Sequence, residues 1–413
     1  MKTMKFAIAS AISACLLMVA CNKPDEEVDL LPTNEIEENS TKVLLNDPLT
    51  EYIPNQYIIV LEDGTLNKPA ARGSKIAYEK TVTSLKKEVI SDFKNVSLKE
   101  NNVKKAFGYA LQGFVANLTQ EQVKELSNDP RVKAIEKDYI ISISSALDID
   151  LEQSSSQRTP WGINRVGGAR AASNRTAWVL DSGIDLNHPD LNVNVSRSRT
   201  FVTSGADSRD ADDRNGHGTH VAGTIGALNN NFGVVGVAPG AKLVALKVLA
   251  GNGSGEFSWT IEALDYVASN GKKWDVVNMS LGPRTRYTSV AVDNAVRNVA
   301  SKDIRVVMAA GNSNDDSRFY SPARVNAKRV FTISNMNRNN DIAPTSNYGS
   351  PVDFAAPGTN ILSTWPGGRY ATISGTSMAA PHVAGLLLSG GVKSGGRVRN
   401  DKDNNKDKIA VRK

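Results

Sequence analysis

The hydrophobic positions of residues 54–143 predict a small domain that mixes strands and helices. Short apolar runs of strand-like composition alternate there with two stretches in which apolar residues recur at helical spacing. Thr119, followed by Gln122 three residues later, has the pattern of a helix N-cap. The expected strands are residues 56–62, 103–110, 113–118, 131–136 and 139–143, and the expected helices are residues 74–93 and 120–128. This order predicts an α+β ferredoxin-like sandwich.

A second pattern begins at residue 158 and predicts a larger α/β domain that extends to residue 390. Apolar runs alternate there with helical stretches, and the runs are Ala177–Leu180, Lys242–Leu249, Val276–Met279 and Arg305–Ala309. The alternation is typical of a doubly wound, mainly parallel sheet, in which functional residues follow the carboxyl ends of the strands. Four glycines precede residue 158 and 28 follow it, which indicates tight turns and backbone placed close to a ligand.

The first 21 residues predict an export signal. Lys2 and Lys5 precede an uncharged apolar run of about 15 residues, which is shorter than the roughly 20 residues that span a bilayer. The run ends in LMVAC, which resembles the lipobox of bacterial lipoproteins, and this resemblance implies a lipid anchor on Cys21 and a membrane as partner. Ordinary signal cleavage with an incidental cysteine is the alternative.

Polar composition predicts three connecting or terminal segments. Residues 22–53 are rich in Glu, Asp, Asn, Pro and Thr and are expected to form a flexible tether, in which DEE at 25–27 resembles the surface-export signals of some Gram-negative lipoproteins. Residues 144–157 are expected to form an exposed linker, and residues 391–413 a solvated charged tail. The tail alternates oxygen-bearing side chains but lacks the glycine and the bidentate glutamate of an EF-hand loop.

Charge and cysteine content exclude several classes of function. A net charge of +6 over 413 residues is weak support for nucleic-acid binding, and we expect no nucleic-acid partner. Residues 22–157 carry −7 and residues 158–413 carry +11, so opposite charges favour docking of the two domains. Cys15 and Cys21 are the only cysteines, which excludes a disulfide framework or a cysteine metal site in either domain.

Three segments carry the residue types of a nucleophilic mechanism. AWVLDSGID places Asp181 at the end of a buried strand, RNGHGTHVAG places His217 after a Gly-flanked turn, and SGTSMAAPHVAG places Ser377 at the start of a helix. Peptide hydrolysis by a serine needs a base for the hydroxyl proton and a carboxylate that orients the imidazole. In MAAGNSN, the side-chain amide of Asn312 can donate to an oxyanion together with the Ser377 N–H.

Taken together, DSGID, GHGTHVAG, AAGN and GTSMAAPHVAG resemble the subtilase family (peptidase S8), whose triad has the chain order Asp, His, Ser. NGSGEFS, SNYGS and PGTNILSTW are most similar to its proteinase K branch, and YALQGFVANLTQEQVKELSNDPRVKAIEKD resembles the inhibitor I9-type propeptides of these proteases. The resemblance implies a serine-type endopeptidase with the triad Asp181, His217 and Ser377 and with Asn312 at the oxyanion. It also implies a zymogen whose propeptide, residues 54–143, inhibits the enzyme and is removed near residues 140–158.

The resemblance further implies a substrate cleft and no cofactor for catalysis. A polypeptide substrate is expected to lie as an extended strand between two edges, Gly253, Ser254 and Gly255 on one side and Ser280, Leu281 and Gly282 on the other. The pocket beside the cut is expected to be walled by residues 280–282 and by Ala309, Ala310 and Gly311. These walls carry no charge, which predicts an apolar or broad preference. Asp353 in PVDFAAPG matches a calcium ligand of the family, so a structural Ca²⁺ is expected there.

Other readings remain open from the sequence. His220 and His382 are expected to serve packing, and His188 is expected in an exposed turn. Alternatives to a broad exported protease of the cell envelope are a dedicated processing peptidase for one exported precursor and an inactive, membrane-tethered peptide-binding module.

Overall fold

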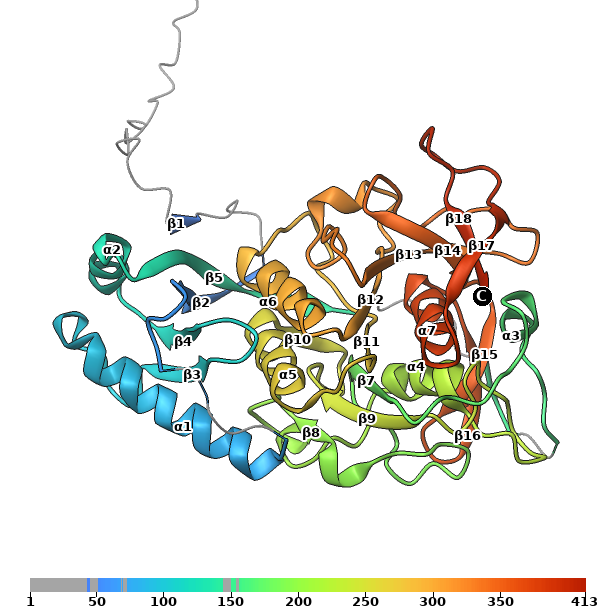
Figure 1. Cartoon of the computed structure of the whole chain (residues 1–413), viewed down its shortest axis with the longest axis horizontal. Helices are drawn as coiled ribbons and strands as arrows, with labels where there is room; N and C mark the ends of the chain where they lie inside the picture. The colour runs from blue at the N-terminus through green and yellow to red at the C-terminus, as the bar shows by residue number, and fades with distance from the viewer. Residues whose placement is uncertain (1–42, 45–50, 68, 70–72, 144–149, 154–155) are drawn as a thin grey trace, which may run out of the picture. The chain divides into compact units, whose positions relative to one another are not determined.

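The computed structural model describes residues 43–44, 51–67, 69, 73–143, 150–153 and 156–413, all within one unit of residues 40–413 (Figure 1). The expected signal segment, Cys21 and nearly all of the expected tether lie outside these residues. Within the described ranges, no helix is both long enough and apolar enough to cross a membrane.

The N-terminal domain is the expected α+β sandwich. Its elements are β2 (Tyr52–Leu61), α1 (Lys75–Asp92), the short turn η1 (Lys94–Val96), β3 (Val103–Phe107), β4 (Gly113–Asn117), α2 (Gln120–Asn128) and β5 (Val132–Ser142). The strands pair antiparallel in the order β5-β2-β4-β3, and β1 (Val43–Leu44) adds to β5 in parallel. Thr119 caps α2 in a reciprocal capping box with Gln122, as the sequence predicts.

The two faces of this sheet pack against different partners, because successive side chains of a strand point to opposite sides. Ile59 and Phe114 face α1 and α2 in a core of their own. Ile58 and Val115 belong instead to a core that they share with α5 (Phe257–Asn270) and α6 (Val290–Ser301) of the larger domain. The small domain is therefore seated on the large one by its sheet.

Two strand predictions in this domain are corrected by contacts with the larger domain. The expected strand 103–110 ends at Phe107, because the backbone N–H groups of residues 108–110 donate to the Asp265 carboxylate. The two expected strands 131–136 and 139–143 are one strand, β5. Asp138, a residue that disfavours a strand on its own, is buried there and accepts hydrogen bonds from Ser258 N and Gln56 Nε2.

The larger domain is a doubly wound, mainly parallel sheet, which confirms the predicted fold class. Its strand order is β17-β18-β14-β13-β12-β11-β7-β9-β8, and the β17–β18 pair is antiparallel. The strands are β7 (Thr176–Asp181), β8 (Arg199–Thr200), β9 (Lys242–Lys247), β11 (Val276–Met279), β12 (Arg305–Ala309), β13 (Val330–Met336), β14 (Val352–Pro357), β17 (Val392–Arg397) and β18 (Lys408–Arg412). Further helices are α3 (Trp161–Arg165), α4 (His217–Gly226) and α7 (Thr376–Leu388), with short turns η2 (Val195–Arg197), η3 (Ala206–Ser208) and η4 (Ser317–Phe319).

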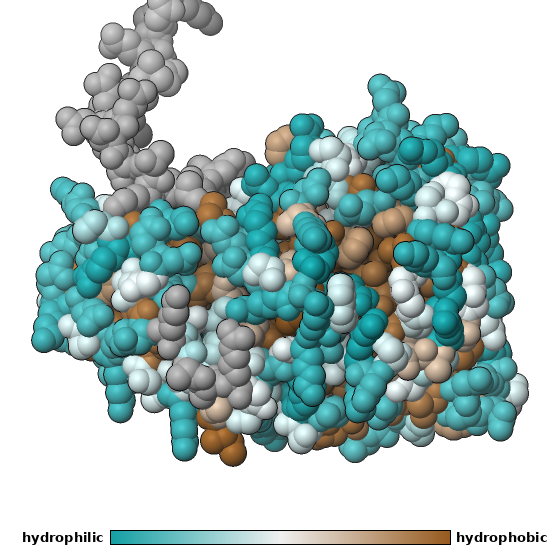
Figure 2. Space-filling view, viewed as in Figure 1, coloured by the Kyte–Doolittle hydropathy of each residue, from teal (hydrophilic) through white to brown (hydrophobic). Residues whose placement is uncertain are grey.

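Helices cover both faces of this sheet (Figure 1), which explains why its central strands β7, β11 and β12 are buried at every position and mainly apolar. In β7, Trp178 and Leu180 point into the core under α5 and α6. Ala177 and Val179 point into the core under α4 and α7. Hydrophilic side chains cover most of the face shown in Figure 2. The carboxyl ends of β7, β11 and β12 and the first turns of α4 and α7 carry the residues singled out from the sequence.

The segment after residue 390 is not the solvated tail that its composition suggests. It forms β17 and β18, and β18 extends the main sheet by pairing in parallel with β14. Ile409 and Ala410 are buried, and buried Asp407 accepts a hydrogen bond from Ser334 Oγ at 2.5 Å. The sequence pattern missed this element because its inward-facing positions are few and stand among charged residues.

The expected linker also contains ordered structure in its described part. β6 (Asp150–Glu152) pairs antiparallel with β16 (Arg369–Ile373), which in turn pairs with β15 (Ile361–Trp365). Further along, Arg158 forms a parallel bridge with Val234. The chain is thus paired with the large domain at residues 150–152 and again at Arg158.

Candidate active site

Asp181 and His217 meet although 36 residues separate them in the sequence. Asp181 is the last residue of β7, and His217 is the first residue of α4, whose N-cap is Gly216 at φ +112°. His217 Nδ1 lies 2.7 Å from Asp181 Oδ1, and both side chains are buried. A carboxylate only accepts hydrogen bonds, so Nδ1 carries the proton and Nε2 is left as the basic nitrogen.

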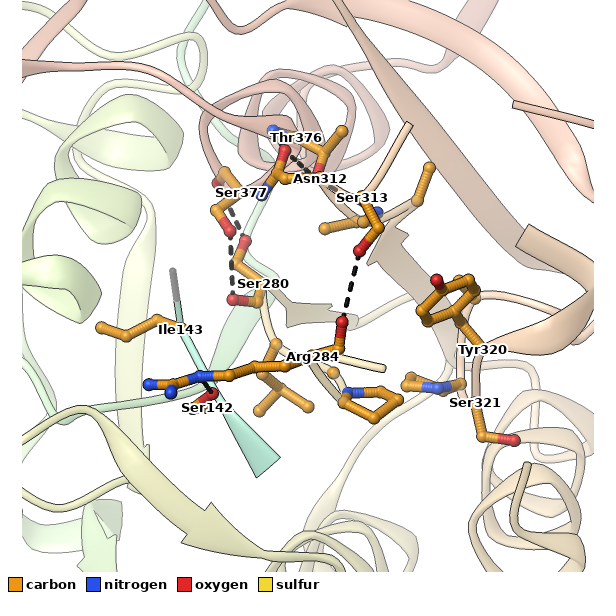
Figure 3. Close-up of a pocket in the computed structure, with 18 residues that line it drawn as sticks. Ser142, Ile143, Ser280, Arg284, Asn312, Ser313, Tyr320, Ser321, Thr376 and Ser377 are labelled. Atoms are coloured by element: carbon orange, nitrogen blue, oxygen red, sulfur yellow. Dashed lines mark hydrogen bonds between the residues drawn. The ribbon is translucent and has the colours of Figure 1, made fainter. Parts of the chain in front are cut away.

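Ser377 lies in the first turn of α7, where backbone N–H groups have no partner within the helix. The helix begins after Gly375 at φ +152°, a value that favours glycine. Ser377 Oγ donates to the Ser280 carbonyl at 3.3 Å, and Ser280 Oγ donates to the Ser377 carbonyl at 2.9 Å (Figure 3). The hydroxyl must therefore leave Ser280 before it can give its proton to an imidazole.

Asn312 is held with its amide NH₂ available. Its Oδ1 accepts from the backbone N–H of Thr376 at 3.0 Å and from Thr376 Oγ1 at 3.1 Å. The side chain is partly exposed and lies beside Ser377 in the same pocket (Figure 3). Because Thr376 uses only the oxygen of this amide, the nitrogen can serve a negatively charged oxygen in the pocket.

The sequence reasoning missed Asp213, which organises the turn before His217. Its buried carboxylate accepts from Ser182 Oγ, from the N–H groups of Asn215 and Gly216, and from the N–H and hydroxyl of Thr219, at 2.6–3.0 Å. Burial raises the pKa of Asp213, while these hydrogen bonds favour the charged form. An aspartate two residues before an Asn-Gly turn and a helix start was the available signal.

The end of β5 lies between the two edges expected to hold a substrate. β5 pairs antiparallel with β10 (Ser254–Glu256), with Ser142 opposite Ser254 and Ile141 opposite Gly255. Ile143 N donates to the Gly253 carbonyl at 3.1 Å, and Ser142 N donates to the Gly282 carbonyl at 3.2 Å. The chain's own strand thus forms the main-chain pairing that was expected of a substrate.

A cavity of about 250 Å³ opens beside Ser377 at the end of this strand. As expected, its lining contains residues 280–282 and 309–311, and it also contains Asn312, Thr376 and Tyr320. Arg284 lines it as well, so the expectation that no charge borders the pocket holds for the two segments named but not for the whole rim. The arginine was missed because it follows the expected wall by two residues.

The remaining histidines lie away from the reacting groups. His220 Nε2 lies 2.9 Å from the Ile361 carbonyl, and burial lowers its pKa to about 3. His382 Nδ1 lies 2.8 Å from the Met378 carbonyl, and burial lowers its pKa to about 4. His188 is buried with only 3% of its surface exposed, so the prediction of an exposed turn is wrong for this residue.

The surroundings of Asp353 do not favour a divalent cation. Its Oδ2 accepts from the Thr332 N–H at 3.0 Å, and the positive charge of Lys408 acts on the same carboxylate. No group of three or more His, Cys, Asp or Glu residues that could hold a metal occurs in the part of the chain that the structure describes. One carboxylate beside a lysine is a poor donor set for Ca²⁺, which takes six to eight oxygens.

Four carboxyl groups lie where the small domain meets the large one: Glu136, Asp138 and Asp265 are buried, and Glu256 is half-buried. Glu136 accepts from Ser289 Oγ and Ala291 N at the start of α6, and Asp138 accepts from Ser258 N at the start of α5. Burial raises the pKa of Glu136, Glu256 and Asp265 to about 7 each and also raises that of Asp138. We therefore expect the contact between the domains to depend on pH near neutrality.

Comparisons with known proteins agree with this geometry. The model of the subtilase family matches residues 177–389, and that of peptidase inhibitor I9 matches residues 56–144. Alkaline serine exoprotease A of Vibrio alginolyticus is 34% identical over 393 residues, which cover 91% of this chain and 69% of that protein. Subtilisin E of Bacillus subtilis (strain 168) is 40% identical over 332 residues, which cover 76% and 79%. The crystal structure of a cold-adapted subtilisin-like serine proteinase is similar with a TM-score of 0.51 and 36% identity, over 61% of this chain and 96% of that one.

Proposed function

Because the chain belongs to the subtilase family of serine endopeptidases, we propose that it is an exported peptidase made as a zymogen, with Asp181, His217 and Ser377 as its triad. Two observations carry this proposal: the 2.7 Å bond between Asp181 and His217, and an extended strand of the chain's own that already pairs with the edge expected to hold a substrate. Ser377 and Asn312 border the same cleft.

In the proposed mechanism, each of these groups has one task. His217 Nε2 takes the Ser377 hydroxyl proton as Oγ attacks the carbonyl carbon, and Asp181 stabilises the imidazolium. The Ser377 N–H and the Asn312 amide donate to the oxyanion. His217 then gives its proton to the leaving amine, and water releases the acyl group in the same way. A donor such as Asn312 contributes about 2.7–4 kcal/mol, a figure measured on subtilisin, to which this chain is similar.

The small domain is proposed to inhibit the enzyme until it is cut away. β5 fills the substrate edges with backbone hydrogen bonds, and its described part ends at Ile143 next to the cavity. The chain is tied to the large domain again at β6, which begins at Asp150. Cleavage between these two points, within the expected linker of residues 144–157, would separate the inhibitor from the enzyme.

The finer parts of the proposal concern substrate, branch and location. The cavity walls of residues 280–282 and 309–311 support an apolar or broad preference for the residue before the cut. The proteinase K branch is proposed from the motifs of the catalytic domain, and anchoring through a lipidated Cys21 from the LMVAC motif. A profile of cleaved peptides in which Lys or Arg dominated the position before the cut would contradict the proposed preference.

Replacing Ser377 by alanine tests the proposed function. We expect S377A to remain a full-length precursor, while the wild type releases a fragment of about 256–270 residues that begins in the linker. Turnover of S377A should fall on the order of 10⁶-fold, as in the relative whose kinetics are known. Gel analysis of both proteins during expression, with N-terminal sequencing of the fragment, gives the result. A precursor that is still processed in S377A would overturn the proposal.

A dedicated processing peptidase and an inactive binding module are the alternatives. Digestion of casein separates the first from a broad protease, because a dedicated enzyme would leave casein intact. Labelling by a fluorophosphonate, which reacts with an activated serine, separates the second. We expect the mature wild type to be labelled and S377A to stay unlabelled.

A further inference from the structure

The strand β5 shows where the side chains of a bound peptide lie. Ser142 donates its N–H to the Gly282 carbonyl and lies opposite Ser254 across the cleft. Ile143 follows it at the edge of the cavity beside Ser377. Ser142 bonds to the Gly282 edge and Ile143 to the Gly253 edge, so we expect the next residue of a peptide in the same register to return to the first edge, where the Ser280 carbonyl lies 3.3 Å from Ser377 Oγ. The position of Ser142 is therefore the third one before the cleaved bond.

Arg284 reaches this position from the loop that forms one edge of the cleft. Its Nε donates to Ser142 Oγ at 2.5 Å, and its side chain extends along the rim of the cavity toward Ser142 and Ile143 (Figure 3). The same loop contacts β5 further back, where Thr285 Oγ1 lies 2.9 Å from the Tyr139 hydroxyl. The loop thus contacts side chains of the bound strand as well as its backbone.

The guanidinium of Arg284 is available to a substrate because no carboxylate of the described residues pairs with it. Two neighbouring arginines are paired, Arg286 with Asp315 at 2.6 Å and Arg318 with Asp316 at 2.8 Å. For Arg284, no ion pair occurs in the described residues, and its side chain is exposed. Ser142 Oγ accepts only from Nε of Arg284. The other N–H groups of the guanidinium have no protein acceptor among the described residues.

We propose that Arg284 is a specificity-determining residue that favours peptides with Asp or Glu at the position of Ser142, the third before the cut. This inference rests on the proposed peptidase function. A carboxylate can accept two parallel hydrogen bonds from a guanidinium, and charge-assisted bonds are stronger than the neutral bond that a serine makes. Because Ser142 is neutral, the inhibitory strand is bound less tightly at this position than an acidic peptide would be. The weaker binding favours release of the inhibitor after cleavage.

The test uses quenched peptides built on the chain's own sequence around the cleft, IIXISS, with X as Glu, Gln or Lys. For the mature wild type we expect kcat/KM for Glu to exceed that for Gln by about 5- to 10-fold at low salt, with Lys the poorest. Added salt should reduce this ratio, since the pair is exposed. In Arg284→Gln the Glu and Gln peptides should be cleaved within about 2-fold of each other. Arg297→Gln, an exposed arginine on α6, removes the same charge elsewhere and should keep the preference.

A second readout uses the full-length chain. Ser142→Glu should slow release of the cleaved inhibitor relative to Ser142→Gln, and Arg284→Gln in the same chain should abolish the difference. Equal cleavage of the Glu and Gln peptides by the wild type, or a preference that survives in Arg284→Gln, would overturn this inference and leave the proposed function standing. Failure of the wild type to cleave any peptide, without fluorophosphonate labelling, would overturn both.

Discussion

At the scale of single residues, the candidate site depends on groups that never touch a substrate. His217 is aligned by Asp181, and the turn that carries it is held by Asp213 through five hydrogen bonds. Lys247, fully buried, donates to the Ser182 carbonyl at 2.5 Å and pairs with Asp207 at 3.1 Å. The strand end of Asp181 and the helix start of His217 are therefore joined by one buried polar network.

Replacing Asp213 by asparagine should loosen this network. An amide offers one accepting oxygen, so at least two of the five donors lose their partner, at about 1–3 kcal/mol each. We expect D213N to lower the unfolding free energy by about 3 kcal/mol and kcat by at least 10-fold, because His217 shifts. Denaturant unfolding and peptide kinetics measure the two effects. The exposed Asp210→Asn serves as control and should change stability by less than about 1 kcal/mol. Wild-type kcat in D213N would show that the turn is held by other contacts.

At the scale of elements, the C-terminal hairpin is part of the sheet that carries the site. β18 covers the edge of β14, which otherwise would present unpaired backbone groups. Ile409 packs with Met336, Ile342 and Ala355 in a small core of its own. The hairpin thus supports β13 and β14 from the side opposite the cleft.

Truncating Ile409 measures this support. Leaving a cavity at a fully buried isoleucine costs about 2–4 kcal/mol, so we expect I409A to lower the unfolding free energy by that amount. The matched Lys393→Ala change on exposed β17 should cost less than about 0.5 kcal/mol. Equal stability of the two variants in denaturant unfolding would mean that the hairpin is not packed as described.

At the scale of the whole molecule, docking of the small domain combines net charge with buried titratable groups. The two parts carry net charges of −7 and +11, although residues 391–413 supply +5 of the latter, away from the cleft. The contacts in the interface are local pairs of groups. Carboxylates of β5 accept hydrogen bonds from the first turns of α5 and α6. Lys105 of β3 pairs with Glu262 at 3.1 Å. Net charge assists encounter, while these local contacts determine the docked position.

The pKa values of buried carboxyl groups between the domains are raised, so the direction in which docking changes with pH can be predicted. Burial raises the pKa of Glu136 from 4.5 to about 7, so its contribution to stability is full below about 4.5 and is lost as pH rises through about 7. A glutamine resembles the neutral acid. We therefore expect Glu136→Gln, in the uncleaved S377A precursor, to become more stable relative to its parent between pH 5 and pH 8, by about 3 kcal/mol.

Unfolding of both precursors by denaturant across this range is the measurement. The exposed Glu125→Gln on α2 provides the control and should follow its parent at every pH. A constant difference between the Glu136→Gln precursor and its parent would show that Glu136 keeps an ordinary pKa in the docked state.

Both domains could be predicted from the chain because strand and helix periodicities, the Thr119 capping box and the glycine-rich turns are local signals. The residue types at Asp181, His217, Ser377 and Asn312 were identified in the same way. Prediction failed where a distant contact outweighed a local preference. Asp138 continues a strand because the Ser258 N–H at the start of α5 donates to its carboxylate. His188 is buried beside the ring of Tyr370. Residues 408–412 form a strand because they pair with the edge of β14.

The sequence by itself determined the fold class, the order of elements and the chemistry available at the strand ends, since these depend on residue type and on neighbours a few positions away. The resemblance already implied His217 as the partner of Asp181, but only the tertiary structure brings the two side chains within 2.7 Å across 36 residues of chain. The tertiary structure also decided that Ser142 rests between the two cleft edges, and that the side chain at its position faces Arg284 across 142 residues of chain. Such distant pairs leave no periodic trace in the sequence, because their partners are joined by the packing of whole elements.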